Sequence, residues 1–275
     1  MMSTTTNTTT TSDRILWTIR DGWTIARREF EQLRHAPGEL VAAVVFPAVL
    51  VILFGFVFGS AISVPGGGNY REYLMPGLFA MTALTGVMAT ALMVSKDVDE
   101  GVMDRFRSIP MARSAVPLGR ILADVCVSIV GLLAMTTIGL ISGWRVHEGL
   151  VRAVAAFALI LLVRFAVSWI GVYVGLSVTT ETADSFVPIV FPVSMLSNSF
   201  VPTDGMPGWL RVIADWNPVS ALVQSCRELF GNPSALPADP SFPVAHPVAT
   251  TIGWSVLIIA VFAPLATRRF YANER

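Results

Sequence analysis

Long runs of uncharged residues divide this sequence, and they restrict its fold more than any other feature. The hydrocarbon core of a bilayer is about 30 Å thick, which an α-helix crosses with roughly 20 apolar residues. Six stretches approach that length: 40–64, 73–94, 121–144, 150–178, a shorter proline-broken run at 186–201, and 248–267. Lipid cannot satisfy backbone polar groups and no alternating strand pattern is present, so the runs predict an all-α polytopic membrane protein with six transmembrane helices.

The composition agrees with a membrane protein. Charged residues make up 14% and apolar residues 53% of the 275-residue chain, whereas soluble domains carry roughly 25% and 45–50%. The 19 basic and 19 acidic side chains cancel. These values exclude a disordered chain, a nucleic-acid-binding protein driven by bulk charge and an ordinary soluble enzyme. The threonine-rich residues 1–13 predict a disordered tail without the apolar core of a cleavable signal peptide.

The basic residues predict the orientation of the helices. Loops rich in Lys and Arg stay on the cytoplasmic side of a membrane. Thirteen of the 19 lie before the first run, between the second and third runs, or after the last run. Five are expected on the opposite side: Arg71, Arg145, Arg152, Arg211 and Arg227. Both termini are therefore predicted to be cytoplasmic in a multi-pass membrane protein, and the 18-to-1 ratio of Arg to Lys favours a bacterial plasma membrane.

A basic amphipathic helix is predicted over residues 14–36. Apolar residues recur there at steps of three and four, and arginines occupy the other face. Because Trp23 lies on the apolar side and a transmembrane run follows, the pattern favours a helix in the membrane interface. The same stripe would also suit a helix docked on a cytosolic protein.

The cytoplasmic loop 96–120 has a marked charge pattern. Acidic residues come first, then Gly101, then Arg105 and Arg107 on either side of Phe106, with Pro110 ending the element. A short helix of this kind could insert an apolar edge into a partner while its charges fix the register. The alternative is a solvated loop whose arginines reflect only the general excess of positive charge on the cytoplasmic side of membrane proteins.

Two segments resemble one known family. The loop resembles the coupling segment of the type-2 ABC exporter permeases at Asp99, Glu100, Gly101, Asp104, Arg105, Arg107, Ser108, Pro110 and Arg113. A later stretch is similar to the external segment of that family at Phe200, Pro202, Pro207, Trp209, Leu210, Ala214, Asn217, Pro218 and Arg227. The resemblance covers nearly the whole chain and is strongest to the antibiotic-resistance branch.

The resemblance implies a non-catalytic permease that forms a dimer on two cytosolic ATPase subunits. Residues 37–275 would form the six-span domain. Its coupling loop would contact the ATPase through the loop residues named in the previous paragraph, together with Phe106. The loop 179–185, with Glu181 and Asp184, would supply a smaller second contact. Segment 202–247 would dip back into the outer leaflet as short re-entrant helices, with Pro202, Trp209, Asn217 and Pro218 at the external gate. Drugs, antibiotics, lipids and lipid-linked glycans are the substrates that relatives of this fold export.

The chain has no motif for binding the nucleotide itself. A phosphate-binding loop needs G-x-x-x-x-G-K-[ST], and the only lysine, Lys96, follows a glycine-free apolar run. ATP and magnesium are therefore expected on the ATPase partner, with no cofactor or metal in this chain. An intramembrane magnesium-dependent prenyl-diphosphate enzyme using the acids near Asp97 is the rival interpretation. A secondary transporter is a third, but no set of intramembrane carboxylates supports ion coupling.

Two charges lie inside the predicted spans. Arg164 falls near the middle of 150–178, where it would pair with an acid, face a wet interior or lock helix packing. Asp124 is placed one turn inside span three, so the two are expected at different depths and no pairing is assumed. The resemblance implies that spans one, two and five line the pathway, and their candidate contacts are Phe46, Phe54, Phe58, Met81, Met88, Ser194 and Asn198. Packing between helices is the alternative for these side chains. Cys126 and Cys226 are placed too far apart for a disulfide.

Overall fold

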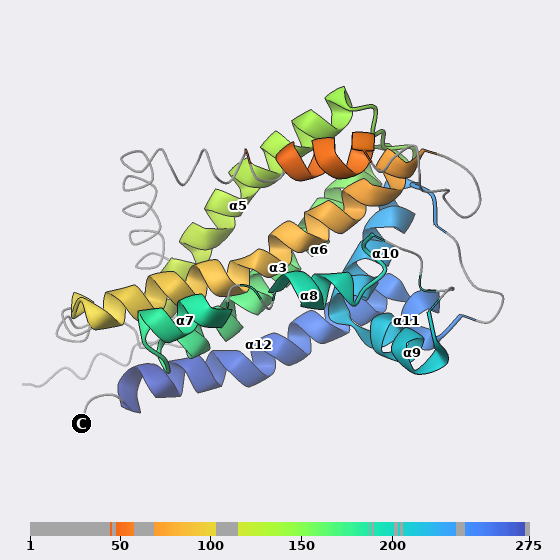
Figure 1. The fold of residues 1–275 in the computed structure, drawn as a ribbon. Helices are drawn as coiled ribbons and strands as arrows, with labels where there is room; N and C mark the ends of the chain where they lie inside the picture. Colours follow the sequence, from red (N-terminus) through yellow and green to blue (C-terminus); the bar gives the residue numbers. More distant parts are fainter. Residues whose placement is uncertain are drawn as a thin grey trace, which may run out of the picture.

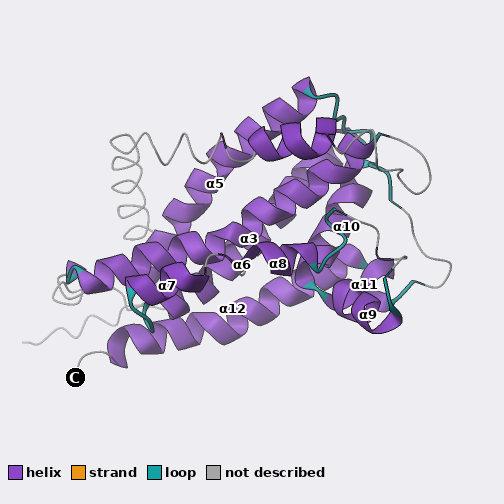
Figure 2. Ribbon diagram, in the orientation of Figure 1, coloured by secondary structure: helices purple, strands orange, loops and turns teal. Residues whose placement is uncertain are grey.

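The computed structural model describes residues 45, 48–57, 69–102, 115–186, 188, 190–200, 203, 206–234 and 240–272. Helices and connecting turns account for all of the described chain (Figures 1 and 2). The predicted tail and interface helix lie outside the described residues, as does most of the coupling loop. So do these predicted site residues: Phe46, Phe58, Asp104, Arg105, Phe106, Arg107, Pro110, Arg113 and Pro202.

Four long helices form the body of the molecule. They are α3 (Tyr70–Asp99), α5 (Ala115–Ile141), α6 (Gly149–Gly175) and α12 (Pro247–Ala272). In the part of the chain that the structure describes, these four are long and apolar enough to cross a membrane. They coincide with the predicted runs 73–94, 121–144, 150–178 and 248–267, which confirms those four predictions.

The first and fifth runs are not described as single long helices. Within the first run, Leu53–Val57 forms a short π-helix, η1. The fifth run is broken, as its prolines predict, because proline lacks an N–H and clashes with the preceding turn. Helix α7 (Thr180–Phe186) precedes the run, which itself contains α8 (Val190–Met195) followed by turns to Phe200. The prediction of a loop over 179–185 was wrong, since α7 forms there and buries Ala183 completely.

Three shorter helices follow: α9 (Gly208–Trp216), α10 (Pro218–Phe230) and α11 (Phe242–Ala245). Asn217 separates the first two, because its side-chain oxygen accepts a hydrogen bond from the N–H of Val219 at 2.9 Å. Pro218 then occupies the first helical position, where a missing N–H costs little. These three helices agree with the expectation of short helices in segment 202–247.

Helices α3 and α6 lie side by side through the centre of the molecule (Figure 1). Gly171 and Gly175 bring them together, because a Cβ atom at either position would lie 2.5 Å from the carbonyl oxygen of Val87 or Ala91. No larger residue fits without moving the backbone of α3 away. Small residues at such contacts let membrane helices approach closely.

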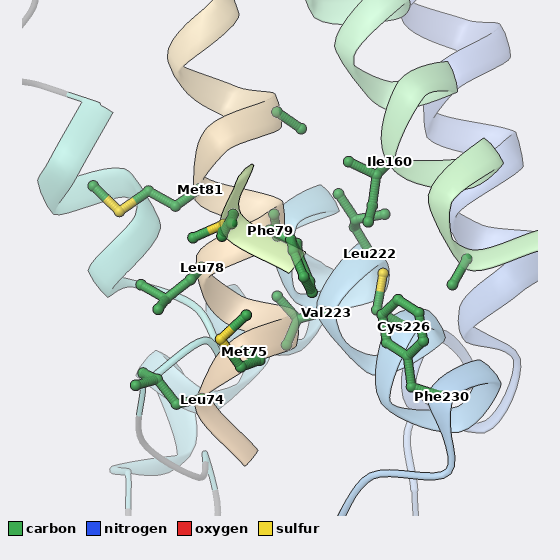
Figure 3. Close-up of a cluster of buried hydrophobic side chains, with 14 of the residues drawn as sticks. Leu74, Met75, Leu78, Phe79, Met81, Ile160, Leu222, Val223, Cys226 and Phe230 are labelled. Carbon is green, nitrogen blue, oxygen red and sulfur yellow. The ribbon is translucent and has the colours of Figure 1, made fainter. Parts of the chain in front are cut away.

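A buried core fixes α10 on α3 and α6 (Figure 3). Phe230 packs edge-on against Trp144 and Phe157, with ring centroids 5.1 and 5.3 Å apart. Trp144, which follows α5, donates its indole N–H to the Asn232 side chain at 2.8 Å. The indole and the amide thus satisfy each other while the rings exclude water.

The two ends of the bundle carry different elements (Figure 1). The α7 end contains α7, the last turns of α3 and α12, and the start of α5. The α9 end contains α9, α10, α11 and the start of α3.

Candidate functional site

A carboxylate joins two elements at the α7 end. The Oδ2 atom of Asp99, the last residue of α3, accepts hydrogen bonds from the Thr180 hydroxyl at 2.7 Å and its N–H at 3.1 Å. Thr180 is the first residue of α7, so the charge also meets the positive end of the helix dipole. Asp99 lies beyond the apolar run 73–94, outside the membrane-spanning part of α3. The hydroxyl bond first, and the amide bond second, lower its pKa from the ordinary value.

An ion pair closes the base of the predicted coupling loop. Arg120, in the first turns of α5, lies 3.0 Å from the carboxylate of Asp97 in α3. Gly101 then turns the chain with a φ of 68°, a left-handed conformation that favours glycine. Both ends of the predicted loop are therefore anchored to the bundle. Among the described residues, no group of three His, Cys, Asp or Glu side chains is arranged to hold a metal ion.

The structure brings the predicted ATPase-contact residues that it describes to this one end. Glu100, Glu181 and Asp184 are exposed there, beside Asp99 and Gly101. Sequence reasoning missed Thr180 and Arg120, which hold this end together. The available signals were a capping threonine at the start of the segment 180–186 and an arginine after the loop that could pair with an acidic residue before it.

An ion pair is buried between α3, α5 and α6. Arg164 donates from Nε and Nη2 to the two carboxylate oxygens of Asp124, at 2.7 and 2.6 Å, and from Nη1 to the Thr82 carbonyl oxygen at 2.6 Å. The Ser168 hydroxyl donates to the same carboxylate at 2.9 Å. The Arg164 and Asp124 side chains are 9% and 7% exposed. Their charges therefore cancel inside the apolar bundle, as a membrane interior requires.

The expectation that these two charges lie at different depths was wrong. Helix α5 begins at Ala115 rather than at 121, so Asp124 lies nine residues inside it, about 14 Å from its start. Arg164 lies eleven residues before the end of the antiparallel α6, about 16 Å from the same end. Gly86 provides the space, because a Cβ there would lie 2.3 Å from Nε of Arg164.

A second arginine, Arg227 of α10, is buried among backbone carbonyls. It is 1% exposed. Its Nη2 atom donates to the carbonyl oxygens of Tyr73 at 3.1 Å, Asn198 at 2.9 Å and Ser199 at 3.3 Å, and Nε reaches the Tyr73 oxygen at 3.3 Å. The guanidinium carbon lies 3.7 Å from the centre of the Tyr73 ring. We call this arrangement the Arg227 clamp. It holds α10 and the turn 196–200 on α3.

Sequence reasoning expected Arg227 on the external side, in a segment of short helices, but did not predict its burial. Two other arginines of the same group also bind carbonyls where helices end. Arg71 donates to the oxygens of Gly55 at 3.2 Å and Ser142 at 3.0 Å. Arg145 donates to those of Leu140 and Trp144 at 2.6 and 2.8 Å. These cations complete hydrogen bonding that helix termini leave open.

The predicted pathway residues have different environments. Met81 is 5% exposed in the core, so it packs rather than lines an open surface in this chain. Met88 is half-buried. Phe54 packs on Phe200, with ring centroids 5.1 Å apart. Ser194 is fully buried, and its carbonyl oxygen accepts a hydrogen bond from the Ser197 hydroxyl.

The predicted gate residues gather at the α9 end. Trp209 and Trp216 are 67% and 52% exposed on one edge of α9. The opposite edge is anchored by Asp215, whose carboxylate accepts hydrogen bonds from Thr203 and Ser241 at 3.2 Å each. The two cysteines, Cys126 in α5 and Cys226 in α10, are free, which confirms that they form no disulfide.

Comparison with known proteins identifies the family. Residues 20–230 match the model of the ABC-2 type transporter family. The chain is 29% identical to a daunorubicin resistance ABC transporter permease of Streptomyces coeruleorubidus, over 90% of this chain and 84% of the relative. It is 25% identical to a doxorubicin resistance ABC transporter permease of Mycobacterium tuberculosis, over 93% of this chain and 91% of the relative. The chain therefore belongs to the ABC-2 type transporter family and is a multi-pass membrane permease of an ABC exporter.

Proposed function

We propose that this permease forms a homodimer, binds two copies of a separate ATPase and exports a hydrophobic or amphiphilic drug or antibiotic. The Asp99–Thr180 contact carries this proposal, because it connects the start of the predicted coupling loop directly to α7, the helix that leads into the broken fifth run. The names of the two relatives, which refer to daunorubicin and doxorubicin resistance, support a drug as the substrate.

The proposed topology places the α7 end in the cytoplasm of a bacterial cell. The first and fifth runs complete six spans, the 14–36 helix lies in the inner interface, and α9 to α11 dip into the outer leaflet. The α9 end fits this orientation because three of its arginines are bound to carbonyl oxygens. Arginines bound to backbone carbonyls in this way would contribute less than solvated arginines to keeping their end of the protein in the cytoplasm.

The two anchors of the coupling loop give a physical route for coupling. A push by the ATPase on the loop would pass through Asp99 to the first turn of α7, and through Arg120 to the first turns of α5. From α7 the displacement would reach α8 and the turn 196–200. ATP and its magnesium ion would be held by the ATPase, which supplies the energy of hydrolysis.

Reconstitution tests the proposal directly. The permease, purified with its ATPase, is expected to accumulate daunorubicin in inverted vesicles when ATP is added, and cross-linking of the purified complex is expected to capture permease dimers. An inactive ATPase, with its phosphate-binding lysine replaced, serves as the control. Transport that persists with that inactive ATPase would contradict the proposal, and so would a purified complex that contains a single permease.

Breaking the Asp99–Thr180 contact is expected to uncouple transport from ATP hydrolysis. In Asp99→Ala or Thr180→Val, drug transport should fall about five- to tenfold while ATP hydrolysis continues, because α7 no longer follows the loop. The double variant should be no worse than either single one, since both remove the same contact. Glu148→Gln, which changes an exposed carboxylate at the α9 end, is the control and should transport normally. Additive losses in the double variant would show that the two residues act separately.

A further inference from the structure

The side chain of Asn198 carries a buried oxygen without a partner. Among the described residues, none donates a hydrogen bond to its Oδ1 atom, although that atom is shielded from solvent. A buried acceptor left without a hydrogen bond costs about 1–3 kcal/mol, so native structures rarely keep one without a use. Asn198 belongs to the fifth run, which is proposed to line the pathway.

The backbone of Asn198 is held in place by three partners. Its carbonyl oxygen accepts from Arg227 at 2.9 Å and from the Tyr73 hydroxyl at 3.3 Å, and its N–H donates to the Ser220 hydroxyl at 3.2 Å. The main chain therefore has little freedom to move. The terminal torsion of an asparagine has a broad energy minimum, so its amide can turn while the backbone stays fixed.

Asn217 shows that the missing partner is specific to Asn198. This second asparagine caps the neighbouring helix, and all of its side-chain groups are used. Its Nδ2 donates to the carbonyl oxygens of Val193 and Leu196, at 3.3 and 2.9 Å, and its Oδ1 accepts from Val219. Asn217 has a structural role that can be read from its contacts, whereas the oxygen of Asn198 has none.

The surroundings of Asn198 restrict the chemistry of a ligand. Met195 and Leu196, just before it, are exposed apolar side chains. The guanidinium of Arg227 lies against its backbone, and the described partners of that guanidinium are uncharged carbonyls and an aromatic ring. An ammonium group placed beside this guanidinium would be repelled, so any charged part of a substrate would lie away from this point. A neutral hydroxyl group attached to an apolar body fits both the acceptor and the apolar surface.

We propose that Asn198 determines substrate specificity by accepting a hydrogen bond from a hydroxyl group of an amphiphilic substrate. This inference rests on the proposed export function and adds the class of substrate. Binding sites built to hydrogen-bond a substrate hydroxyl discriminate against analogues that lack it. One hydrogen bond with a net value of about 0.5–1.5 kcal/mol corresponds to a preference of roughly two- to tenfold.

Two matched probes test the proposal on the complete permease–ATPase complex in lipid nanodiscs. The probes are a pyrene-labelled C12 alkanol and its methyl ether, which differ in the hydroxyl donor, and the readout is the concentration that half-maximally stimulates ATP hydrolysis. The wild type should respond to the alkanol at about a two- to tenfold lower concentration than to the ether. In Asn198→Leu that preference should disappear, the response to the ether should remain, and the melting temperature should not fall.

Asn217→Leu is the control, and it should lower the melting temperature and weaken the response to both probes equally. The proposal is overturned if the wild type does not distinguish the probes, if Asn198→Leu keeps the preference, or if it loses stability and both responses together. These outcomes are compatible with ATP-driven export of daunorubicin, which leaves the proposed function standing. Absence of ATP-dependent daunorubicin export would overturn the proposed function itself, and the inference with it.

Discussion

Replacing Asp124 by alanine is expected to lower the melting temperature of the detergent-purified permease by about 10 °C. The substitution leaves the Arg164 guanidinium buried, charged and bonded to the Thr82 carbonyl oxygen as its remaining described partner. Removing one member of a buried ion pair typically costs about 3–5 kcal/mol, because the other charge stays desolvated. Thermal unfolding followed by tryptophan fluorescence measures the effect. Arg164→Ala should be similarly unstable, since it leaves the carboxylate alone.

The double variant Asp124→Leu/Arg164→Met should recover most of the lost stability. Two apolar side chains of similar size remove both buried charges, and such replacements of buried pairs are often neutral or stabilising. Glu148→Ala is the control. It breaks the exposed Glu148–Arg152 pair, which should change the free energy of unfolding by less than about 1 kcal/mol. A double variant less stable than both single ones would show that the pair itself, and not charge neutrality, holds the three helices together.

Arg227→Leu should release the α10 segment from α3. The carbonyl oxygens of Tyr73, Asn198 and Ser199 would each lose a donor in a place that water cannot reach. Cys226 is a natural reporter, because it is fully buried beside the clamp. In a Cys126→Ser background, maleimide should label Cys226 at least about ten times faster in Arg227→Leu than in the parent. Hydrogen bonds to a charged group are worth about 1.5–3 kcal/mol each, so the loss of the guanidinium exceeds the 1.4 kcal/mol that a tenfold change requires, although the Asn198 oxygen keeps the Tyr73 hydroxyl as a donor.

Two further substitutions make the labelling result specific. The rate of Cys226 labelling in Arg227→Lys should lie between the rates in the parent and in Arg227→Leu, because an ammonium group lacks the planar fork of donors that reaches three carbonyls. Arg211→Leu removes a half-exposed arginine of α9, and Cys226 should be labelled at the same rate in this variant as in the parent. Equal protection of Cys226 in the parent and in Arg227→Leu would mean that apolar packing alone holds α10.

The sequence predicted the elements whose signal is local. Four of the apolar runs became α3, α5, α6 and α12, since length and hydropathy decide whether a helix suits a membrane. The break at Asn217 and Pro218 was equally predictable, because an N-cap followed by proline starts a new helix. Proline spacing also indicated the interrupted fifth run.

Contacts between distant residues were not predictable in the same way. Asp124 and Arg164 are 40 residues apart, and an error of six residues in the start of α5 placed them at different depths. The burial of Arg227 was not predicted, because a positive charge usually marks solvent. Its partners are backbone carbonyls that become available where other helices end, and a single sequence does not show which ends meet.

The close contact of α3 with α6 determines how a displacement can travel through this protein. Gly171 and Gly175 leave no layer of side chains between the two backbones, so sliding one helix past the other would force atoms into overlap and splaying them would lose close packing. Where they touch, the two helices are therefore expected to move as one rigid pair. A displacement that begins near Asp99 would then shift α3 and α6 together, and bending would fall to the elements packed around them.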